Sequence, residues 1–204
     1  MSTREHWEHI YGTKPTDQVS WYSPHLETSL DLIERAAPSR QAAMIDIGGG
    51  AATLVDDLLA RGYENLTVLD ISEAATATAS KRLAAQASRV HWLIGDVAQI
   101  DLAPAQYDLW HDRAVFHFLT DPASRSAYVR QLLQALRPSG HAIIGTFGPE
   151  GPTRCSGLDV VRYDAAALRQ ELGPRLQLLD SFKQQHRTPF GTNQQFLYCL
   201  FRLE

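Results

Sequence analysis

The chain has 204 residues, with 19 Lys or Arg against 23 Asp or Glu, which gives a formal net charge of −4 at pH 7. This length is typical of one domain with a sizeable core, so we expect residues 1–204 to form a single domain. The mild charge, without a basic block, excludes an electrostatic footprint for nucleic acid. We expect a cytoplasmic protein without a membrane partner, because the sequence shows no signal peptide and no apolar run of spanning length.

Helices and strands alternate along most of the chain. A helical pattern over residues 4–11 precedes an aromatic stretch at 19–24, and a second helix is predicted at 27–36. Further helices are predicted over 54–59, 73–87, 123–135 and 164–172, with N-caps at Ser72 and Asp164. The predicted strands cover residues 44–47, 66–69, 90–94, 107–113, 142–147, 176–182 and 195–202.

The glycine turn Gly48-Gly49-Gly50 lies between the strand predicted at 44–47, which contains Asp46, and the helix that begins at Leu54. Glycines there let the backbone approach a ligand closely and adopt positive φ. Asp70 closes the next strand, about twenty residues further on, where a carboxylate can accept hydrogen bonds from both ribose hydroxyls of a nucleoside. The two signals together predict a nucleoside site at this edge of the sheet.

Thr53 stands where a dinucleotide-binding fingerprint requires a third glycine. The pattern Asp46-x-Gly48-Gly49-Gly50-x-Ala52 instead resembles motif I of the class I S-adenosylmethionine-dependent methyltransferases. The resemblance implies a Rossmann-like, doubly wound α/β fold with a seven-stranded sheet, mostly parallel, ending in an antiparallel hairpin. It also implies S-adenosyl-L-methionine as cofactor, S-adenosyl-L-homocysteine as product, and cofactor contacts from Asp46 and the three glycines.

The same resemblance extends along most of the chain. It implies that Asp70 and Ile71 face the ribose and that Asp96 and Val97 meet the adenine, although Asp96 is also a good turn former. Residues 6–22 resemble the opening of small bacterial methyltransferases, in which this segment closes over the site, so Trp21 is a candidate lid residue; plain packing is the alternative. We expect a lid segment at 1–38, a cofactor core at 39–147, and an acceptor loop, helix and hairpin at 148–204.

The acceptor side carries weaker signals. Ligands of open α/β sheets bind beyond the carboxyl ends of the strands. The polar side chains at the end of the fourth predicted strand, Asp112, Arg113 and His117, are therefore candidate site residues. Asp112 could bind the cofactor's ammonium or cap a helix, Arg113 could orient an anion or contact the cofactor, and His117 could accept a proton or pack in the core. His186, in the connection between the last two predicted strands, is a second candidate base if that connection folds back to the cleft.

The two cysteines, Cys155 and Cys199, form no Cys-x-x-Cys pair, so we expect neither a zinc site nor any other metal. Cys155 lies in a long loop, residues 148–157, that is rich in Gly and Pro, and such loops are usually functional or disordered. The loop springs from a strand's carboxyl end and could help select the acceptor. A lone cysteine is more often inert than reactive.

The predicted function is methyl transfer to a small-molecule acceptor by in-line displacement. Residues 112–115 lack the Asn/Asp-Pro-Pro-aromatic motif of many nucleic-acid methyltransferases, which disfavours a nucleic acid acceptor. A protein substrate, methylated on lysine or the terminal amine, is one alternative, and a non-catalytic S-adenosylmethionine-binding module is another. A nicotinamide reductase ranks below both because of Thr53. The sequence does not identify the acceptor atom.

Overall fold

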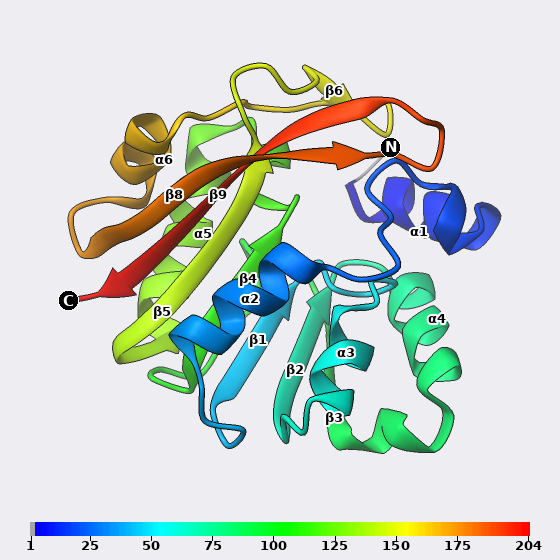
Figure 1. The fold of residues 1–204 in the computed structure, drawn as a ribbon, viewed down its shortest axis with the longest axis horizontal. Coiled ribbons are helices and arrows are strands. Elements are labelled where there is room, and N and C mark those ends of the chain that lie inside the picture. Colours follow the sequence, from blue (N-terminus) through cyan, green and yellow to red (C-terminus); the bar gives the residue numbers. More distant parts are fainter. Residues whose placement is uncertain (1–2) are drawn as a thin grey trace.

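Seven strands form one sheet in the order β3-β2-β1-β4-β5-β9-β8 (Figure 1). The computed structural model describes residues 3–204, so the first two residues of the predicted lid segment lie outside the described part. Strands β1 to β5 pair in parallel, and β9 is antiparallel to both β5 and β8. The sheet strands are β1 (Ala43–Ile47), β2 (Asn65–Asp70), β3 (Val90–Ile94), β4 (Tyr107–Arg113), β5 (Leu136–Phe147), β8 (Leu176–Arg187) and β9 (Asn193–Leu203). The predicted Rossmann-like fold class is confirmed.

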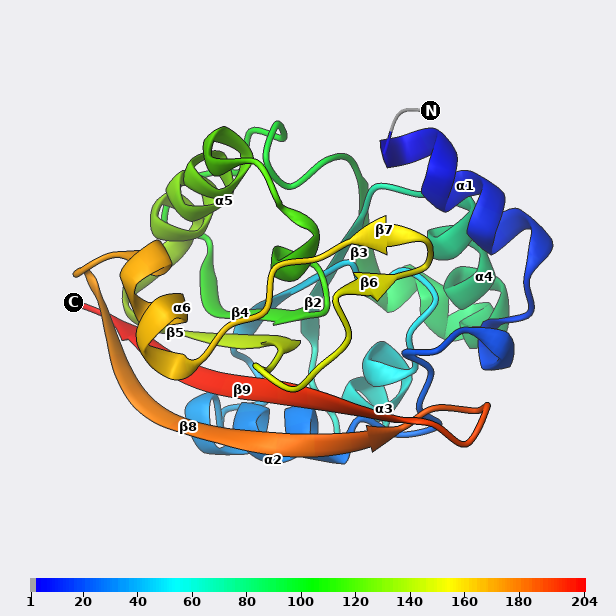
Figure 2. The same ribbon diagram turned by 90° about the horizontal axis from the view of Figure 1, so that it is seen from above.

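Helices cover both faces of this sheet (Figure 2). On one face α2 (Glu27–Ala36) and α3 (Leu54–Ala60) contribute to one apolar core, and on the other α5 (Pro122–Ala135) and α6 (Ala165–Leu172) contribute to a second. Most residues of β1, β2 and β4 are buried, as expected of parallel strands covered on both faces. The remaining helical elements are α1 (Thr3–Thr13), α4 (Glu73–Leu83) and the 3₁₀ turns Thr16–Gln18, Ala84–Arg89 and Phe116–Phe118. No helix within residues 3–204 has the length and apolar character to cross a membrane.

Three helices begin at side-chain caps that are visible in the sequence. Ser72, Asp121 and Asp164 each accept a hydrogen bond from the backbone N–H three residues further on, at 3.2, 2.9 and 2.8 Å. A cap of this kind contributes about 1 kcal/mol to helix stability. The predicted N-caps Ser72 and Asp164 are therefore confirmed, and α4 places its N-terminus beside the end of β2.

Several predicted boundaries differ from the structure. The helix predicted over 73–87 stops at Leu83, because Ala84 adopts φ 50° and the chain continues as a 3₁₀ turn. The strand predicted at 142–147 begins earlier, at Leu136, and the added part contains Ser139 at φ 65° and a register shift against β4. Both regions contain left-handed backbone at non-glycine residues, which the sequence does not announce.

The long loop and the final hairpin also differ. The loop after β5 contains a small hairpin, β6 (Arg154–Cys155) with β7 (Leu158–Asp159). Strand β8 continues to Arg187, so His186 lies in a strand opposite Gln194 and not in the connection. The polar run that ends β8 suggested a turn, but β8 is the edge strand of the sheet and exposes much of its length. In Figure 1 the β6 hairpin and α1 lie beyond the arrowheads of the parallel strands.

Candidate functional site

A cavity of about 320 Å³ lies at the carboxyl ends of β1 to β4. Its floor comes from residues at or just after the strand ends, namely Gly48, Asp70, Ile71, Asp96, Val97 and Arg113. Its cover comes from α1, the segment around Trp21, and Cys155 of the β6–β7 hairpin. Thr3, Trp7 and Tyr11 of α1 line it together because residues four apart share a helix face. The cavity therefore forms where ligands of open α/β sheets bind.

The glycine turn has no room for side chains. Gly48 adopts φ +69°, its N–H donates to the Leu69 carbonyl at 2.7 Å, and a Cβ there would collide with the Val115 side chain. A Cβ at Gly49 would collide with the Asp46 carboxylate, and one at Gly50 would lie 2.6 Å from both the Ala75 Cβ and an Asp70 oxygen. The turn therefore presents bare backbone to the cavity at Gly48.

Asp70 sits at the tip of β2 with its side chain oriented from both sides. One carboxylate oxygen accepts the Gly50 N–H at 3.0 Å, and the other accepts the Ser72 N–H at 2.8 Å. Asp70 is only 5% exposed. Burial raises the pKa of its carboxyl to about 6, against the effect of these two hydrogen bonds, and the charges of Asp46 and Glu8 add to the rise. The carboxylate is thus held rigidly at the cavity wall.

This raised pKa predicts a pH dependence of ligand affinity. A proton on Asp70 removes the charged acceptor that we expect for ribose hydroxyls, so the affinity for S-adenosylhomocysteine should rise as pH increases through about 6 and level off above it. The sign for stability is opposite: because the folded-state pKa exceeds the unfolded value, Asp70 lowers stability as pH rises through that window. Calorimetric titration between about pH 5 and 8 checks the affinity. An Asp70→Asn protein should lose this dependence, and an unchanged profile would contradict the assignment.

Asp46 belongs to a buried hydrogen-bonded chain. One of its oxygens lies 2.6 Å from His111 Nδ1, and His111 Nε2 lies 2.9 Å from Ser29 Oγ. Asp46 does not line the large cavity; it lines a smaller adjoining one of about 40 Å³ together with Gly48, Gly49 and Arg113. Its role in holding cofactor stays a prediction, and the geometry shows that it also fixes β1 against β4 and α2. Sequence reasoning did not single out His111 or Ser29.

Asp112 is placed away from both cavities. Its side chain is fully buried, and it accepts the Tyr128 hydroxyl at 2.7 Å and the backbone N–H of Val115 at 2.9 Å. Burial raises the pKa of its carboxyl to about 6, and the Tyr128 hydrogen bond and backbone donors oppose that rise. Because Asp112 is fully buried and lines neither cavity, this geometry does not support the expectation that it binds the cofactor's ammonium. By accepting the backbone N–H groups of Val115 and Phe116, the Asp112 side chain stabilises the turn that follows β4.

His117 is equally enclosed: its ring lies between Phe118, which is edge-on with centroids 4.6 Å apart, and Phe147, which is tilted with centroids 4.5 Å apart. Its Nδ1 accepts the Phe147 N–H at 3.1 Å, so Nε2 carries the proton. Burial, with the charge of Arg113, lowers the pKa of His117 to about 3. It is fully buried and does not line the cavity, so this geometry does not support the expectation that it accepts a proton from the acceptor and agrees with the packing alternative.

Arg113 and His186 approach each other near the cover. Arg113 lines both cavities, while His186 is 8% exposed and donates from Nε2 to the Ser20 carbonyl at 2.9 Å. Burial, followed by the positive charge of Arg113, lowers the pKa of His186. His186 lies close to the site because it belongs to β8. It does not reach the site through a connection that folds back, the route that the sequence suggests. Neither cavity is lined by it, so a base role for His186 stays a prediction.

Asp96, Val97, Ile71 and Trp21 all line the large cavity, as a cofactor role requires. The Asp96 carboxylate accepts the Ala98 N–H at 2.9 Å and the Gln99 side-chain amide at 3.0 Å, so it also shapes its own turn. Trp21 meets Trp7 edge-on at 5.7 Å between centroids. These contacts agree with both the site and the packing interpretation of Trp21.

Glu8 fastens α1 to the N-terminus of α4. Its carboxylate accepts the backbone N–H groups of Glu73 at 2.6 Å and Ala74 at 3.1 Å, and the Ser72 hydroxyl at 3.1 Å. Although burial acts in the opposite direction, these hydrogen bonds lower the pKa of Glu8. The interaction with the helix dipole is therefore present above its ordinary pKa and is lost as pH falls through the lowered value. Both views show α1 beside α4 (Figures 1 and 2).

This contact predicts that Glu8→Gln speeds ligand exchange. Loss of a charge at a helix N-terminus weakens the contact by about 0.3–1 kcal/mol, so S-adenosylhomocysteine should dissociate about 2–5 times faster when α1 covers the site. Stopped-flow tryptophan fluorescence measures the rate. His9→Gln, on the exposed side of the same helix, should leave the rate unchanged. Equal rates for all three proteins would show that α1 does not gate the cavity.

Sequence reasoning missed several lining residues. Val115 and Phe118 follow β4, and Asp121 and Ser124 open α5. The only available signal was their position after a strand end, which does not say which side chains turn inward. The pairing of Trp7 with Tyr11 was visible in the helical spacing, whereas the contact of Glu8 with α4 joins elements far apart in the sequence.

Comparison with known proteins agrees with this geometry. The fold is that of the class I S-adenosylmethionine-dependent methyltransferases: N-methyltransferase NodS from Bradyrhizobium japonicum WM9, in complex with S-adenosyl-l-homocysteine, has a TM-score of 0.75 at 20% identity over 99% of each chain. A structure described as "Conversion of a Disulfide Bond into a Thioacetal Group during Echinomycin Biosynthesis" has a TM-score of 0.79 at 17% identity, covering 100% of this chain and 92% of the other. At such identities these likenesses show the fold alone.

The sequence match covers the cofactor half of the chain. Residues 44–140 match the family model described as "Methyltransferase domain". Nodulation protein S from Rhizobium fredii is 31% identical over 97 residues, which are 48% of this chain and 54% of that protein. The chain spans about half the length of the curated relatives that it matches. The predicted resemblance to class I methyltransferases is confirmed.

Proposed function

We propose that the protein is an S-adenosylmethionine-dependent methyltransferase acting on a small molecule. The observation that carries this proposal is that Asp70, at the tip of β2, and the bare backbone of Gly48 line one cavity. The residues fit the cofactor: a fixed carboxylate suits ribose hydroxyls, and the glycine turn leaves room for the methionine portion. The family match and the fold support the same cofactor. We also propose that the protein is cytoplasmic, as expected from the sequence.

When bound, S-adenosylmethionine supplies a methyl group activated by its sulfonium charge. The chain's own residues bind and orient. Asp70 accepts the ribose hydroxyls, Asp96 and the Val97 N–H meet the adenine, and Gly48 faces the methionine portion. The aromatic side chains Trp7, Tyr11 and Trp21 close the cavity and exclude water, which helps align an acceptor with the methyl group.

The carboxylates of residues 3–204 that line this cavity are Asp70, Asp96 and Asp121, and the first two are assigned to the cofactor. No histidine or lysine of residues 3–204 lines it. Burial raises the pKa of the Cys155 thiol to about 11, which keeps it protonated, although Ser20 and Arg113 oppose the rise. This composition favours an acceptor atom that is nucleophilic without a strong protein base, such as a thiolate or a neutral amine.

The small-molecule acceptor is favoured over a protein substrate by the enclosure of the cavity. Helix α1 and the β6–β7 hairpin cover it, so a polypeptide would have to displace them. The charge of Arg113 also disfavours a lysine ammonium there. A protein lysine or terminal-amine methyltransferase remains the second candidate, because the same cofactor site would serve it. A non-catalytic cofactor-binding module is the third.

One experiment separates these candidates. The protein is incubated with S-adenosylmethionine labelled in the methyl group and with a cell extract, which is then divided into small molecules and polypeptides. We expect label in the small-molecule fraction. Label only in polypeptides would favour the protein methyltransferase, and tight cofactor binding without transfer to either fraction would favour the binding module.

A further inference from the structure

Arg113 brings to the cavity a positive charge that forms no ion pair with an acidic side chain of residues 3–204. Its Nε donates to the Tyr198 hydroxyl at 2.9 Å and its Nη1 donates to the Trp21 carbonyl at 2.9 Å. Its guanidinium carbon lies 4.5 Å from the centre of the Phe196 ring. None of the ion pairs formed within residues 3–204 includes Arg113. A half-buried cation held only by neutral groups is costly unless an anion joins it.

The arginine has donors to spare. A guanidinium carries a planar fork of N–H groups, and Nη2 donates to no described protein atom. The bonds from Nε and Nη1 hold the side chain in one orientation, so the fork is pre-organised for a ligand. Because Arg113 lines both cavities, that ligand can reach it from the site. A pre-organised fork suits a planar carboxylate, which it binds through two parallel hydrogen bonds.

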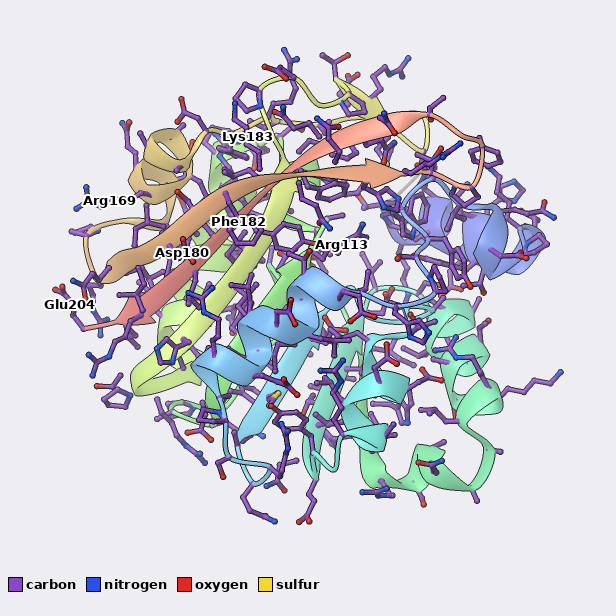
Figure 3. The ribbon with its side chains drawn as sticks, in the orientation of Figure 1. Arg113, Arg169, Asp180, Phe182, Lys183 and Glu204 are labelled. Atoms are coloured by element: carbon purple, nitrogen blue, oxygen red, sulfur yellow. The ribbon has the colours of Figure 1, made fainter. Side chains whose placement is uncertain are left out.

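The side chain leans away from the ribose end of the cavity. It crosses β5 at Gly145, where a Cβ would lie 3.1 Å from Tyr198 and 3.5 Å from Arg113 itself, to reach Tyr198 and Phe196 on β9. Asp70 ends β2, which β1 separates from β4 in the sheet. Figure 3 shows Arg113 toward the middle of the molecule, whereas Arg169 and Glu204 lie at its periphery. The cavity therefore has an acidic end at Asp70, which we assign to the ribose, and a basic end at Arg113.

The Asp46 carboxylate, which shares the smaller cavity with Arg113, is bound to His111, and Cys155 and His186 supply no anion. Burial raises the pKa of Cys155 to about 11, so its thiol stays neutral. Burial lowers the pKa of His186, so this histidine is neutral and adds no second cation. Tyr198 offers a hydroxyl that already accepts from Arg113. One cation without a second beside it suits a singly charged ligand better than a phosphate dianion.

We propose that Arg113 binds the carboxylate of the methyl acceptor, and that the acceptor is a small carboxylic acid with an apolar or aromatic body. The body would pack against Trp7, Trp21 and Phe118, whose rings meet edge-on with centroids 5.7 and 5.1 Å apart around Trp7. This inference rests on the proposed methyltransferase function, because it assigns the ribose end to the cofactor. It makes Arg113 the residue that selects acceptors by charge.

The test compares benzoate with benzamide, two probes of nearly equal shape that differ in charge. Their binding to the protein saturated with S-adenosylhomocysteine is followed by the fluorescence of the tryptophans that line the cavity. We expect benzoate to bind at least about tenfold more tightly than benzamide, a difference of about 1.4 kcal/mol. Arg113→Gln should abolish the preference, and Arg113→Lys, which keeps the charge without the fork, should retain part of it. Circular dichroism confirms that each variant is folded.

Two results would overturn the proposal. Equal binding of benzoate and benzamide to the unaltered protein would remove the anion site, whatever the variants do. A loss of S-adenosylhomocysteine affinity of more than about tenfold in Arg113→Gln, with unchanged affinity for methylthioadenosine, which lacks the amino-acid portion, would give Arg113 to the cofactor's own carboxylate. Failure of the unaltered protein to bind S-adenosylhomocysteine would instead contradict the proposed function, and the benzoate comparison can be repeated without it.

Discussion

Replacement of Asp70 by Ala should weaken S-adenosylmethionine binding by about 1–3 kcal/mol, which is about 5- to 150-fold in Kd. The carboxylate is buried at the cavity wall and is the acceptor that we assign to both ribose hydroxyls. Its removal leaves those hydroxyls without a charged partner inside a covered site. Isothermal titration calorimetry measures the change directly.

The Asp70 side chain also orients the Gly50 and Ser72 N–H groups, so the fold itself must be checked. Asp70→Asn keeps the shape and an oxygen acceptor, and it should lose part of the affinity with less effect on thermal stability. Asp31→Ala, an exposed carboxylate on α2, is the matched control and should bind as the unaltered protein does. Unchanged affinity in a folded Asp70→Ala protein would remove Asp70 from the site.

Gly48→Ala should lower both stability and cofactor affinity. The residue adopts φ +69°, where an alanine is strained, and its new Cβ would collide with Val115. Backbone strain of this kind costs about 1–3 kcal/mol, and each kcal/mol shifts Tm by about 2–4 °C in a chain of this size. Displacement of the turn also moves the backbone that faces the ligand. Denaturant unfolding and calorimetry measure the two effects separately.

A double variant separates the collision from the strain. Val115→Ala makes room for the new methyl group, so Gly48→Ala with Val115→Ala should recover the steric part of the loss and keep the part due to φ. Gly12→Ala is the control, because a Cβ there meets nothing within 4 Å and its φ is not positive. If Gly48→Ala unfolds and binds as Gly12→Ala does, the turn is not as constrained as we describe.

The sequence predicted most accurately those features that depend on residues close to one another in the chain. The order of strands and helices, the caps Ser72 and Asp164, and the positions of Gly48 and Asp70 depend on residues close to one another in the chain. Strand ends of a parallel sheet meet at one edge, so a local pattern was enough to bring Gly48, Asp70 and Asp96 into one cavity.

The acceptor side could not be predicted in the same way, because it depends on contacts between distant segments. Asp112 follows a strand as Asp70 does, yet Tyr128 and the following backbone bind its oxygens. His117 looked like a base from its type, but the rings of Phe118 and Phe147 enclose it. The direction of Arg113 is set by β9, more than eighty positions away. No pattern within one segment announces such pairings.

The central claim is that the cavity beside Asp70 binds the sulfonium nucleoside. Its most direct test is a calorimetric titration of the unaltered protein with S-adenosylhomocysteine and, separately, with nicotinamide adenine dinucleotide. We predict saturable binding of one S-adenosylhomocysteine per chain and far weaker binding of the dinucleotide. No measurable binding of S-adenosylhomocysteine, or a preference for the dinucleotide, would contradict the account.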